Sequence, residues 1–415
     1  MVKLFSGRLR PRRRDPWWQL AYVGIILVMV LGVWFSASAV VPALTRQWNL
    51  SQGDAAWLTN AVQLGFVVGA LLSASLNLAD VLSVRRLIGG SALLSAASTA
   101  AVPMYVHSPG PAIALRFATG ITLAGVYPPG MKVIASWFTL RRGFAIGVLV
   151  GALTLGSGSP HLINASANVP WKTLLWISAG IAFAGGLLAL VCIRDGPFAR
   201  AAPRISPAYC VGMFRDRSQR LVNFGYFGHM WELYAVWTWL PAYIAASLGA
   251  RGHSGSTHTA TEVIAFCAIG VAGLLGAVVG GIVADRVGRA RLTIGALAGS
   301  GACCALSPLI FGQHPIWLVC VCLWWGATVI ADSAQFSAAL SETADPHYIG
   351  TALTVQTAVG FLVTVGSIRL VLWLSSEVGW RWAFLPLAIG PLLGMVSMSA
   401  WRRIAPTATP RVAIG

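Results

Sequence analysis

Long apolar runs separated by short polar breaks recur along the whole chain. Twelve of them reach the length of about 20 residues that a helix needs to cross roughly 30 Å of hydrocarbon. They occupy residues 17–43, 54–79, 84–105, 110–137, 142–166, 171–194, 219–246, 261–284, 292–312, 315–340, 348–374 and 379–401. Because lipid offers no partner to an open backbone group, we expect all twelve to be helices.

The composition supports this interpretation. Of the 415 residues, 57% are hydrophobic and only 10% are charged, and the mean hydropathy is +0.73. A soluble domain carries about 25% charged residues. The sequence therefore predicts an all-α integral membrane protein with twelve transmembrane helices.

The basic residues explain the net charge of +17 and predict the orientation. If the N-terminus is cytoplasmic, 22 of the 29 Lys and Arg residues fall in cytoplasmic segments and 4 in outer segments. This bias predicts a multi-pass protein of the inner (plasma) membrane with both termini in the cytoplasm. Such residues meet anionic lipid headgroups. A nucleic-acid partner is not expected, because it would require a basic folded surface.

An internal repeat divides the chain into halves. "LADVLSVRRLIGG" from Leu78 and "VADRVGRARLTIG" from Val283 match at a constant offset of 205 residues, close to half of the length. We therefore predict a basic tail (1–16), a six-helix bundle (17–194), a central loop (195–218), a second bundle (219–401) and a C-terminal tail (402–415). Two similar bundles with a site between them are typical of transporters.

The second copy of the repeat resembles the loop motif of the Major Facilitator Superfamily. The matching residues are Gly281, Asp285, Arg286, Gly288, Arg289 and Arg291. The first copy keeps Asp80 and Arg86 but has Leu76, Val81 and Ser83 at the other motif positions. Any charged contact that this copy makes between helix ends should therefore be weaker than that of the second copy, or built differently. In span 4, Arg116 and Gly120 resemble the intramembrane Arg motif of the family.

This resemblance implies two pseudo-symmetric six-helix bundles around a central cavity bordered by spans 1, 4, 7 and 10. It also implies that the two loop motifs form a charged gate that opens in one conformational state. The alternative is that these residues form no gate and are only basic residues of a tight cytoplasmic turn, which set the orientation of the chain in the membrane.

Ionisable residues inside the spans are the candidates for proton coupling. A charge at mid-membrane costs on the order of 2.5–3.5 kcal/mol, so it persists mostly where it has a function. His229 and Glu232 share one face of span 7. We predict Glu232 as the principal proton-coupling group, His229 as its partner, and Asp332 as a further candidate. The alternative is that His229 and Glu232 form a neutral hydrogen-bonded pair that only fixes helix packing. Coupling through Glu232 would also fail if this residue were walled off from water and bonded solely to neighbouring helices.

The candidates for substrate binding are polar or aromatic residues within the spans. They are Arg116, Lys132, Gln335, Asn60, Gln63, His161, Gln356, Trp231 and Tyr234. Asp332 and Gln335 share a face of span 10 and could pair with Lys132 or Arg116. For each candidate the alternative is an interhelical contact.

The balance of these charges favours an anion. If one acid takes up a proton, the cavity becomes net positive, so we predict a symporter of a small organic or inorganic anion with protons. A proton-coupled exporter of amphipathic compounds is the alternative, although the glycine-rich span 5 ("GVLVGALTLGSGSPHL") lacks the Gly-Pro step of family antiporters. An enzyme would need a metal cluster or an activated nucleophile. We expect neither, and we expect a monomer without metal or cofactor.

Overall fold

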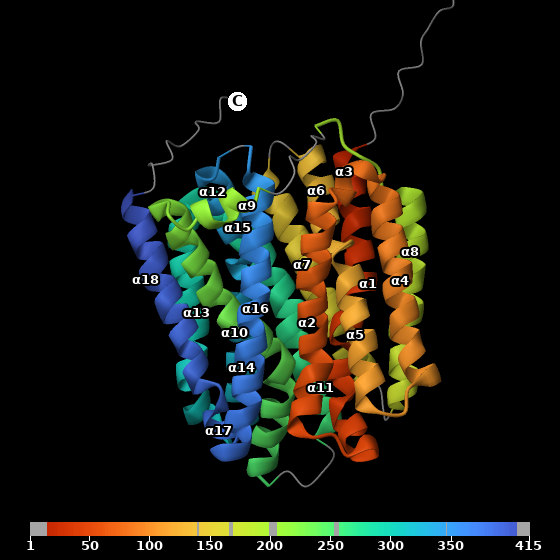
Figure 1. Ribbon diagram of the computed structural model, residues 1–415. Coiled ribbons are helices and arrows are strands. Elements are labelled where there is room, and N and C mark those ends of the chain that lie inside the picture. The colour runs from red at the N-terminus through yellow and green to blue at the C-terminus, as the bar shows by residue number, and fades with distance from the viewer. Residues whose placement is uncertain are drawn as a thin grey trace, which may run out of the picture.

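The structure is a computed structural model that describes residues 15–138, 141–165, 169–198, 206–252, 257–345 and 347–404, apart from the side chains of Asp80, Arg142 and Pro207. All regular secondary structure in these ranges is helical (Figure 1), so the predicted all-α class is confirmed. Most of both predicted tails and part of the predicted central loop (199–205) lie outside the described residues.

The first half of the chain forms eight helical segments. They are α1 (Pro16–Trp48), α2 (Gln52–Ser75), α3 (Leu78–Val81), α4 (Val84–Tyr105), α5 (Pro109–Leu123), α6 (Tyr127–Trp137), α7 (Arg142–Ala165) and α8 (Trp171–Cys192). Ser51 and Asp54 form a capping box that fixes the start of α2.

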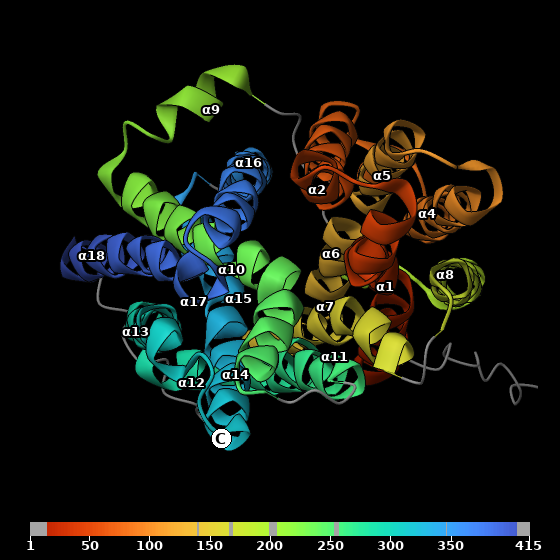
Figure 2. The ribbon, with the colours of Figure 1, turned by 90° about the horizontal axis from the view of Figure 1, so that it is seen from below.

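The short helix α9 (Pro207–Gly212) precedes the second half. That half consists of α10 (Arg217–Ala250), α11 (His258–Phe266), the π-helix η1 (Cys267–Ala272), α12 (Gly273–Val287), α13 (Arg289–Ile310), α14 (Pro315–Ala331), α15 (Ser333–Thr343), α16 (Ile349–Glu377), α17 (Trp380–Ala383), the 3₁₀ turn η2 (Leu385–Ala388) and α18 (Ile389–Ile404). Helices α1 to α8 lie on one side of the molecule and α10 to α18 on the other (Figure 2).

Ten helical stretches among the described residues are long and apolar enough to cross a membrane. The two other predicted spans, 110–137 and 219–246, correspond to α5 with α6 and to α10. The first is interrupted at residues 124–126, next to Pro128 and Pro129, and the second carries several polar side chains. The count of twelve spans therefore stays a prediction.

Glycines allow the same close helix contact in both halves. A Cβ added at Gly120 of α5 would clash with the carbonyl of Val62 in α2, and one at Gly326 of α14 would clash with the carbonyl of Ala268 in η1. Backbones can approach this closely only where the side chain is absent.

Two helix pairs join the halves. Helix α7 packs along η1 and α12, and α2 packs along α16. Gly143 and Gly281 face each other at one end of the first pair, and Gly158 and Gly270 toward the other end. The glycine-rich run of span 5 is therefore an interface between the halves.

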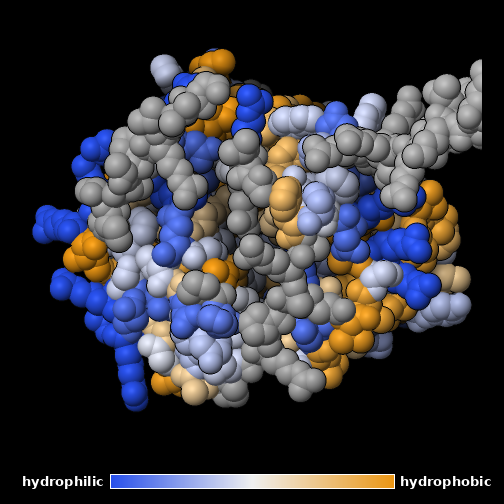
Figure 3. Space-filling model, turned by 90° about the horizontal axis from the view of Figure 1, so that it is seen from above, coloured by the Kyte–Doolittle hydropathy of each residue, from blue (hydrophilic) through white to orange (hydrophobic). Residues whose placement is uncertain are grey.

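Both ends of the described chain lie on one face of the molecule, here named the terminal face (Figure 1). Hydrophilic side chains gather on it (Figure 3). The exposed arginines in its loops and helix ends are Arg85, Arg86, Arg141, Arg194, Arg215, Arg217, Arg220, Arg286, Arg291, Arg402 and Arg403. The other end of the bundle is named the opposite face.

Candidate functional site

A buried histidine–aspartate pair lies deep in the second half. His229 Nδ1 of α10 is 3.0 Å from Asp332 Oδ1, and both side chains are 1% exposed. The two groups are not aligned for a hydrogen bond, and within the described residues His229 Nε2 and both Asp332 oxygens have no hydrogen-bond partner. Because buried polar atoms are normally satisfied, this pair is incomplete as it stands.

The pair sits at a break in span 10. Helix α14 ends at Ala331, α15 begins at Ser333, and Asp332 occupies the N-cap position without capping α15 through its side chain. The N-terminal end of α15 favours a negative charge here. The imidazole of His229 packs against Phe336, with ring centroids 5.5 Å apart. The predicted single span 315–340 is therefore two helices with an acid at the junction.

The pairing predicted for Glu232 was wrong: His229 faces Asp332, whereas Glu232 faces α13 and α14. Oε1 of Glu232 accepts from Trp325 Nε1 over 2.6 Å and from Cys304 Sγ over 3.2 Å, and Oε2 accepts from Ser300 Oγ over 2.7 Å. The side chain is 1% exposed. These bonds satisfy the carboxylate through neighbouring helices, which is the condition under which the sequence analysis expects coupling through Glu232 to fail.

Arg116 binds backbone rather than an acid. Its Nη1 donates to the Val33 carbonyl over 2.8 Å, Nη2 donates to the Trp34 carbonyl, and Nε donates to the Leu58 carbonyl over 3.4 Å. The guanidinium thus ties α5 to α1 and α2. The predicted pairing of Asp332 or Gln335 with Arg116 is not found.

Lys132 and Gln335 also have partners other than those predicted. Lys132 Nζ donates to the Ala79 carbonyl of α3 over 3.2 Å. Gln335 Oε1 accepts from Arg289 Nη1 over 2.8 Å, and Arg289 Nε donates to Glu342 Oε1 over 2.8 Å. Arg289 therefore connects α13 to α15, and Gln335 is part of that contact.

Three buried amides lie on α2 and α16, two helices that pack along each other. Asn60 Nδ2 donates to the Val365 carbonyl over 3.4 Å, and Gln356 Oε1 accepts from Ser337 Oγ over 3.4 Å. Asn60 Oδ1, Gln356 Nε2 and both amide atoms of Gln63 are buried without a partner among the described residues. Gln63 is one turn from Asn60 on α2, so its amide faces the boundary between the halves.

An aromatic cluster crosses the boundary between the halves next to Gln63. Its members are Trp34 and Phe35 of α1, Phe66 of α2, Tyr234 and Trp237 of α10, and Phe361 of α16, with ring centroids 4.7–6.0 Å apart. Tyr234 therefore lies at the interface between the halves, and its role as a substrate contact stays a prediction. Trp231 instead packs against Gly390 of α18 within the second half.

His161 belongs to a polar cluster near the opposite face. Its Nδ1 is 2.6 Å from Oε2 of Glu262 in α11, and the other oxygen of that carboxylate accepts from Asn164 Nδ2 over 2.8 Å. Glu262 and Asn164 line a cavity of about 480 Å³. This cluster joins the two halves.

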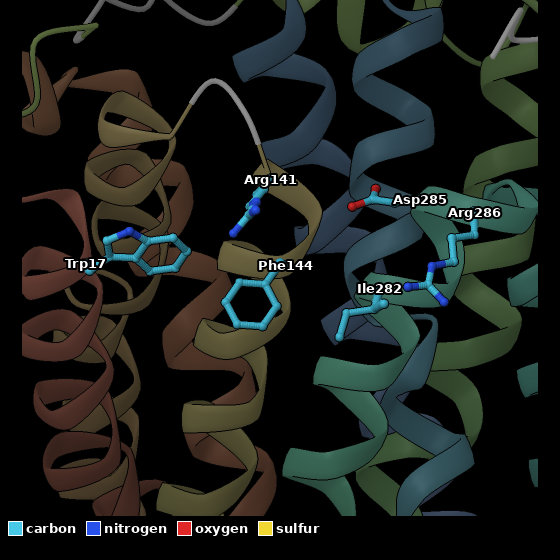
Figure 4. A pocket seen from close by; sticks show the side chains of 6 residues that line it. All are labelled: Trp17, Arg141, Phe144, Ile282, Asp285 and Arg286. Atoms are coloured by element: carbon cyan, nitrogen blue, oxygen red, sulfur yellow. The ribbon is translucent and has the colours of Figure 1, made fainter. Parts of the chain in front are cut away.

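The second loop motif lies between the halves at the terminal face. Asp285, Arg286, Arg141, Trp17, Phe144 and Ile282 line a cavity of about 430 Å³. Figure 4 shows Asp285 turned toward Arg141 and the start of α7, with Arg286 on the far side of Asp285 and its guanidinium extending toward Ile282. A Cβ added at Gly143 would lie 2.6 Å from Oδ1 of Asp285, so the carboxylate sits directly against the N-terminus of α7, which favours a negative charge.

The first loop motif is built differently, as its sequence predicted. In the second copy, Gly288 makes the turn with φ 90°, and Arg291 is exposed. In the first copy Ser83 is extended and the left-handed residue is Asn77, followed by the extra helix α3. Arg86 is exposed, and the side chain of Asp80 lies outside the described residues.

Sequence reasoning missed the partners of the buried acids. Glu262 is the single acid near the start of span 8 and was overlooked because it sits at the edge of that span. Cys304, a residue type that the sequence analysis did not single out, donates to Glu232. No group of three or more His, Cys, Asp or Glu residues in the described ranges is arranged to hold a metal ion.

This arrangement of two packed helical halves with polar groups at their boundary defines a membrane transporter. A family model of the Major Facilitator Superfamily matches residues 22–368, so the chain belongs to that superfamily. The predicted resemblance is confirmed.

Three curated relatives are similar over part of the chain. One is a probable sulfoacetate transporter of Cupriavidus necator, 24% identical over 208 residues (45% of this chain and 47% of that protein). A gallate transporter of Pseudomonas putida is 27% identical over 161 residues (37% and 33%). An MFS-type transporter of Aspergillus terreus is 29% identical over 178 residues (41% and 55%). The chain therefore spans about a third to just over half of the length of these relatives.

Proposed function

We propose that this transporter moves a small organic anion together with protons, and that the His229–Asp332 pair couples the two movements. The observation that supports this is the incomplete pair itself: a buried acid and a buried imidazole 3.0 Å apart, with three polar atoms that have no hydrogen-bond partner among the described residues. A purely structural pair would be expected to satisfy them.

The coupling follows from the charges. With His229 protonated and Asp332 ionised, the pair is neutral and offers an anion little attraction. A proton that reaches Asp332 removes the negative charge and leaves an imidazolium whose Nε2–H is free to bind an anion. Two unit charges about 4 Å apart interact by about 4 kcal/mol at an effective dielectric constant of about 20, which is enough to make anion binding depend on that proton.

The substrate class rests on two of the relatives. One is named for sulfoacetate and another for gallate, and both compounds are small organic anions. The amide of Gln63 and Nε2 of Gln356, which have no partner among the described residues, offer hydrogen bonds to such a molecule, and the aromatic cluster offers ring surface. Arg116 is assigned a positioning role, because its donors already bind carbonyls.

The orientation, domain division and assembly belong to the same proposal. The arginine-rich terminal face is placed in the cytoplasm and the opposite face outside the inner membrane. Residues 17–194 and 219–401 act as two bundles that alternate access to the site between them. The protein works as a monomer and catalyses no chemical conversion.

Uptake into proteoliposomes under an imposed pH gradient tests the proposal, with sulfoacetate and gallate as probes. Asp332→Asn should abolish accumulation but retain exchange of labelled for unlabelled anion. Glu342→Gln is the control, since this acid is half exposed and pairs with Arg289. Accumulation that survives in Asp332→Asn, or uptake of cationic drugs in place of both anions, would overturn the assignment.

A further inference from the structure

A second polar pair joins the halves at the opposite face, far from the proposed coupling pair. His161 of α7 and Glu262 of α11 have side chains only 3% and 8% exposed, and His161 Nδ1 is 2.6 Å from Glu262 Oε2. Asn164 Nδ2 donates to Glu262 Oε1 over 2.8 Å and to the Ala39 carbonyl of α1 over 3.3 Å. The carboxylate of Glu262 thus holds α11 against α7, and Asn164 links the same site to α1.

The hydrogen bonds fix which nitrogen of His161 can take up a proton. An ionised carboxylate only accepts, so Nδ1 of His161 carries the hydrogen that bonds Glu262. Nε2 then has the free lone pair, and it is buried without a partner among the described residues. Histidine is the side chain whose proton exchange falls in the range of about pH 5–8.

The cavity of about 480 Å³ gives this pair a route to the opposite face. Glu262, Asn164 and Arg46 are among its lining residues, so the carboxylate end of the pair borders the cavity. The aromatic cluster at the centre of the molecule does not line this space.

The other charged and titratable groups on the elements packed around the pair come from α1, α8, α10, α11 and α14. Arg46 of α1 is a fixed cation in the same cavity, and Nε2 of His258 in α11 donates to the Asn164 carbonyl over 3.2 Å. Helix α8 contributes Trp171 to the cavity and Lys172 beside it. Tyr243 of α10 donates to the Ser307 carbonyl, and the outer half of α14 offers Cys320 and Cys322 as its titratable groups.

We propose that His161 and Glu262 form a proton-binding latch that closes the opposite face of the transporter. A proton arriving at Nε2 of His161 converts the hydrogen bond into a buried ion pair and pulls the ends of α7 and α11 together. The imidazolium faces the carboxylate only in the closed form, so the closed form binds this proton more tightly than the open form. Closure is therefore favoured at low pH and weakens as the pH rises.

This inference goes beyond the proposed function, because it needs no substrate. The latch also suits symport, because a proton that enters from the opposite face favours closure of that same face.

Backbone hydrogen exchange of the full protein in lipid nanodiscs tests the latch, read at residues 155–165 and 258–266. After correction for the intrinsic pH dependence of exchange, the wild type should exchange several-fold more slowly at about pH 5.5 than at about pH 8. His161→Gln keeps an N–H for the carboxylate but does not titrate, so its exchange should be the same at both pH values. Glu262→Gln should also lose the response.

His347→Gln is the matched control, because His347 pairs with Asp345 in the same way but is 87% exposed in a loop of the terminal face. It should keep the wild-type response, as should Asp332→Asn. No pH response in the wild type, or a response that persists in His161→Gln or Glu262→Gln, would overturn the latch. Failure of Asp332→Asn to stop accumulation would instead count against the proposed function alone.

Discussion

The indole nitrogen of Trp325 donates to Oε1 of Glu232 over 2.6 Å, deep inside the second half. This contact, together with Ser300 and Cys304, gives the carboxylate three donors from α13 and α14. Glu232 is therefore positioned to hold α10 against its neighbours, whereas the incomplete His229–Asp332 pair is the proton-coupling pair of our proposal.

Replacing Glu232 by Gln should lower stability but spare coupling. The amide keeps the shape, but it has one acceptor oxygen where the carboxylate has two, so Ser300 must turn its hydroxyl toward the Leu297 carbonyl or a buried donor is left unpaired at about 1–3 kcal/mol. We expect a clearly lower melting temperature in detergent and pH-driven accumulation that is retained per folded molecule. Loss of accumulation at unchanged stability would restore Glu232 as the coupling group.

The fold could be predicted from the sequence because hydrocarbon imposes a simple rule. Runs of apolar residues long enough to cross it must be helices. The predicted boundaries lie close to the observed ones: span 84–105 is α4, and span 171–194 matches α8 within two residues. The interruptions were harder to predict. Asp332 breaks span 10, and no proline or glycine adjoins it to signal the break.

The candidate site was predicted only in part. Polarity alone identified His229, Glu232, Asp332, Gln63 and His161 as unusual within their spans. Their partners depend on how each helix is rotated against several others, which one sequence does not specify. His229 and Glu232 share one helix face, yet the small angle between them directs one to α15 and the other to α13 and α14.

Gln63→Leu should weaken substrate binding without weakening the fold. Both amide atoms of Gln63 are buried and have no partner among the described residues, so their removal relieves a desolvation cost. We expect an unchanged or higher melting temperature and a KM for the transported anion raised about tenfold, as the loss of one hydrogen bond would give.

Gln19→Leu is the matched control for that variant. Gln19 Nε2 donates to the Cys192 carbonyl over 3.2 Å, and Oε1 accepts from the Arg194 backbone over 3.1 Å. Its loss should reduce stability and leave KM alone. The same KM for Gln63→Leu and the wild type would remove Gln63 from the substrate site.

Arg116→Lys should destabilise the first half. A lysine keeps the charge but cannot reach three carbonyls on two helices with one ammonium group. Since each lost bond to a charged donor is worth about 1.5–3 kcal/mol, we expect a marked fall in melting temperature. The KM of the folded fraction should stay the same, measured by uptake normalised to folded protein. A raised KM at unchanged stability would place Arg116 in the substrate site after all.

Gly326→Ala tests the close contact between α14 and η1. The added Cβ would meet the carbonyl oxygen, carbonyl carbon and Cα of Ala268, all backbone atoms that cannot turn aside. Forcing even one methyl group into such a contact costs about 1–3 kcal/mol, so the melting temperature should fall.

Gly295→Ala in α13 is the matched control, because a Cβ there meets nothing within 4 Å. Alanine is the better helix former by about 1 kcal/mol, so this control should be unchanged or more stable. Equal melting temperatures for the two variants would mean that the helices do not pack as closely as the glycines allow.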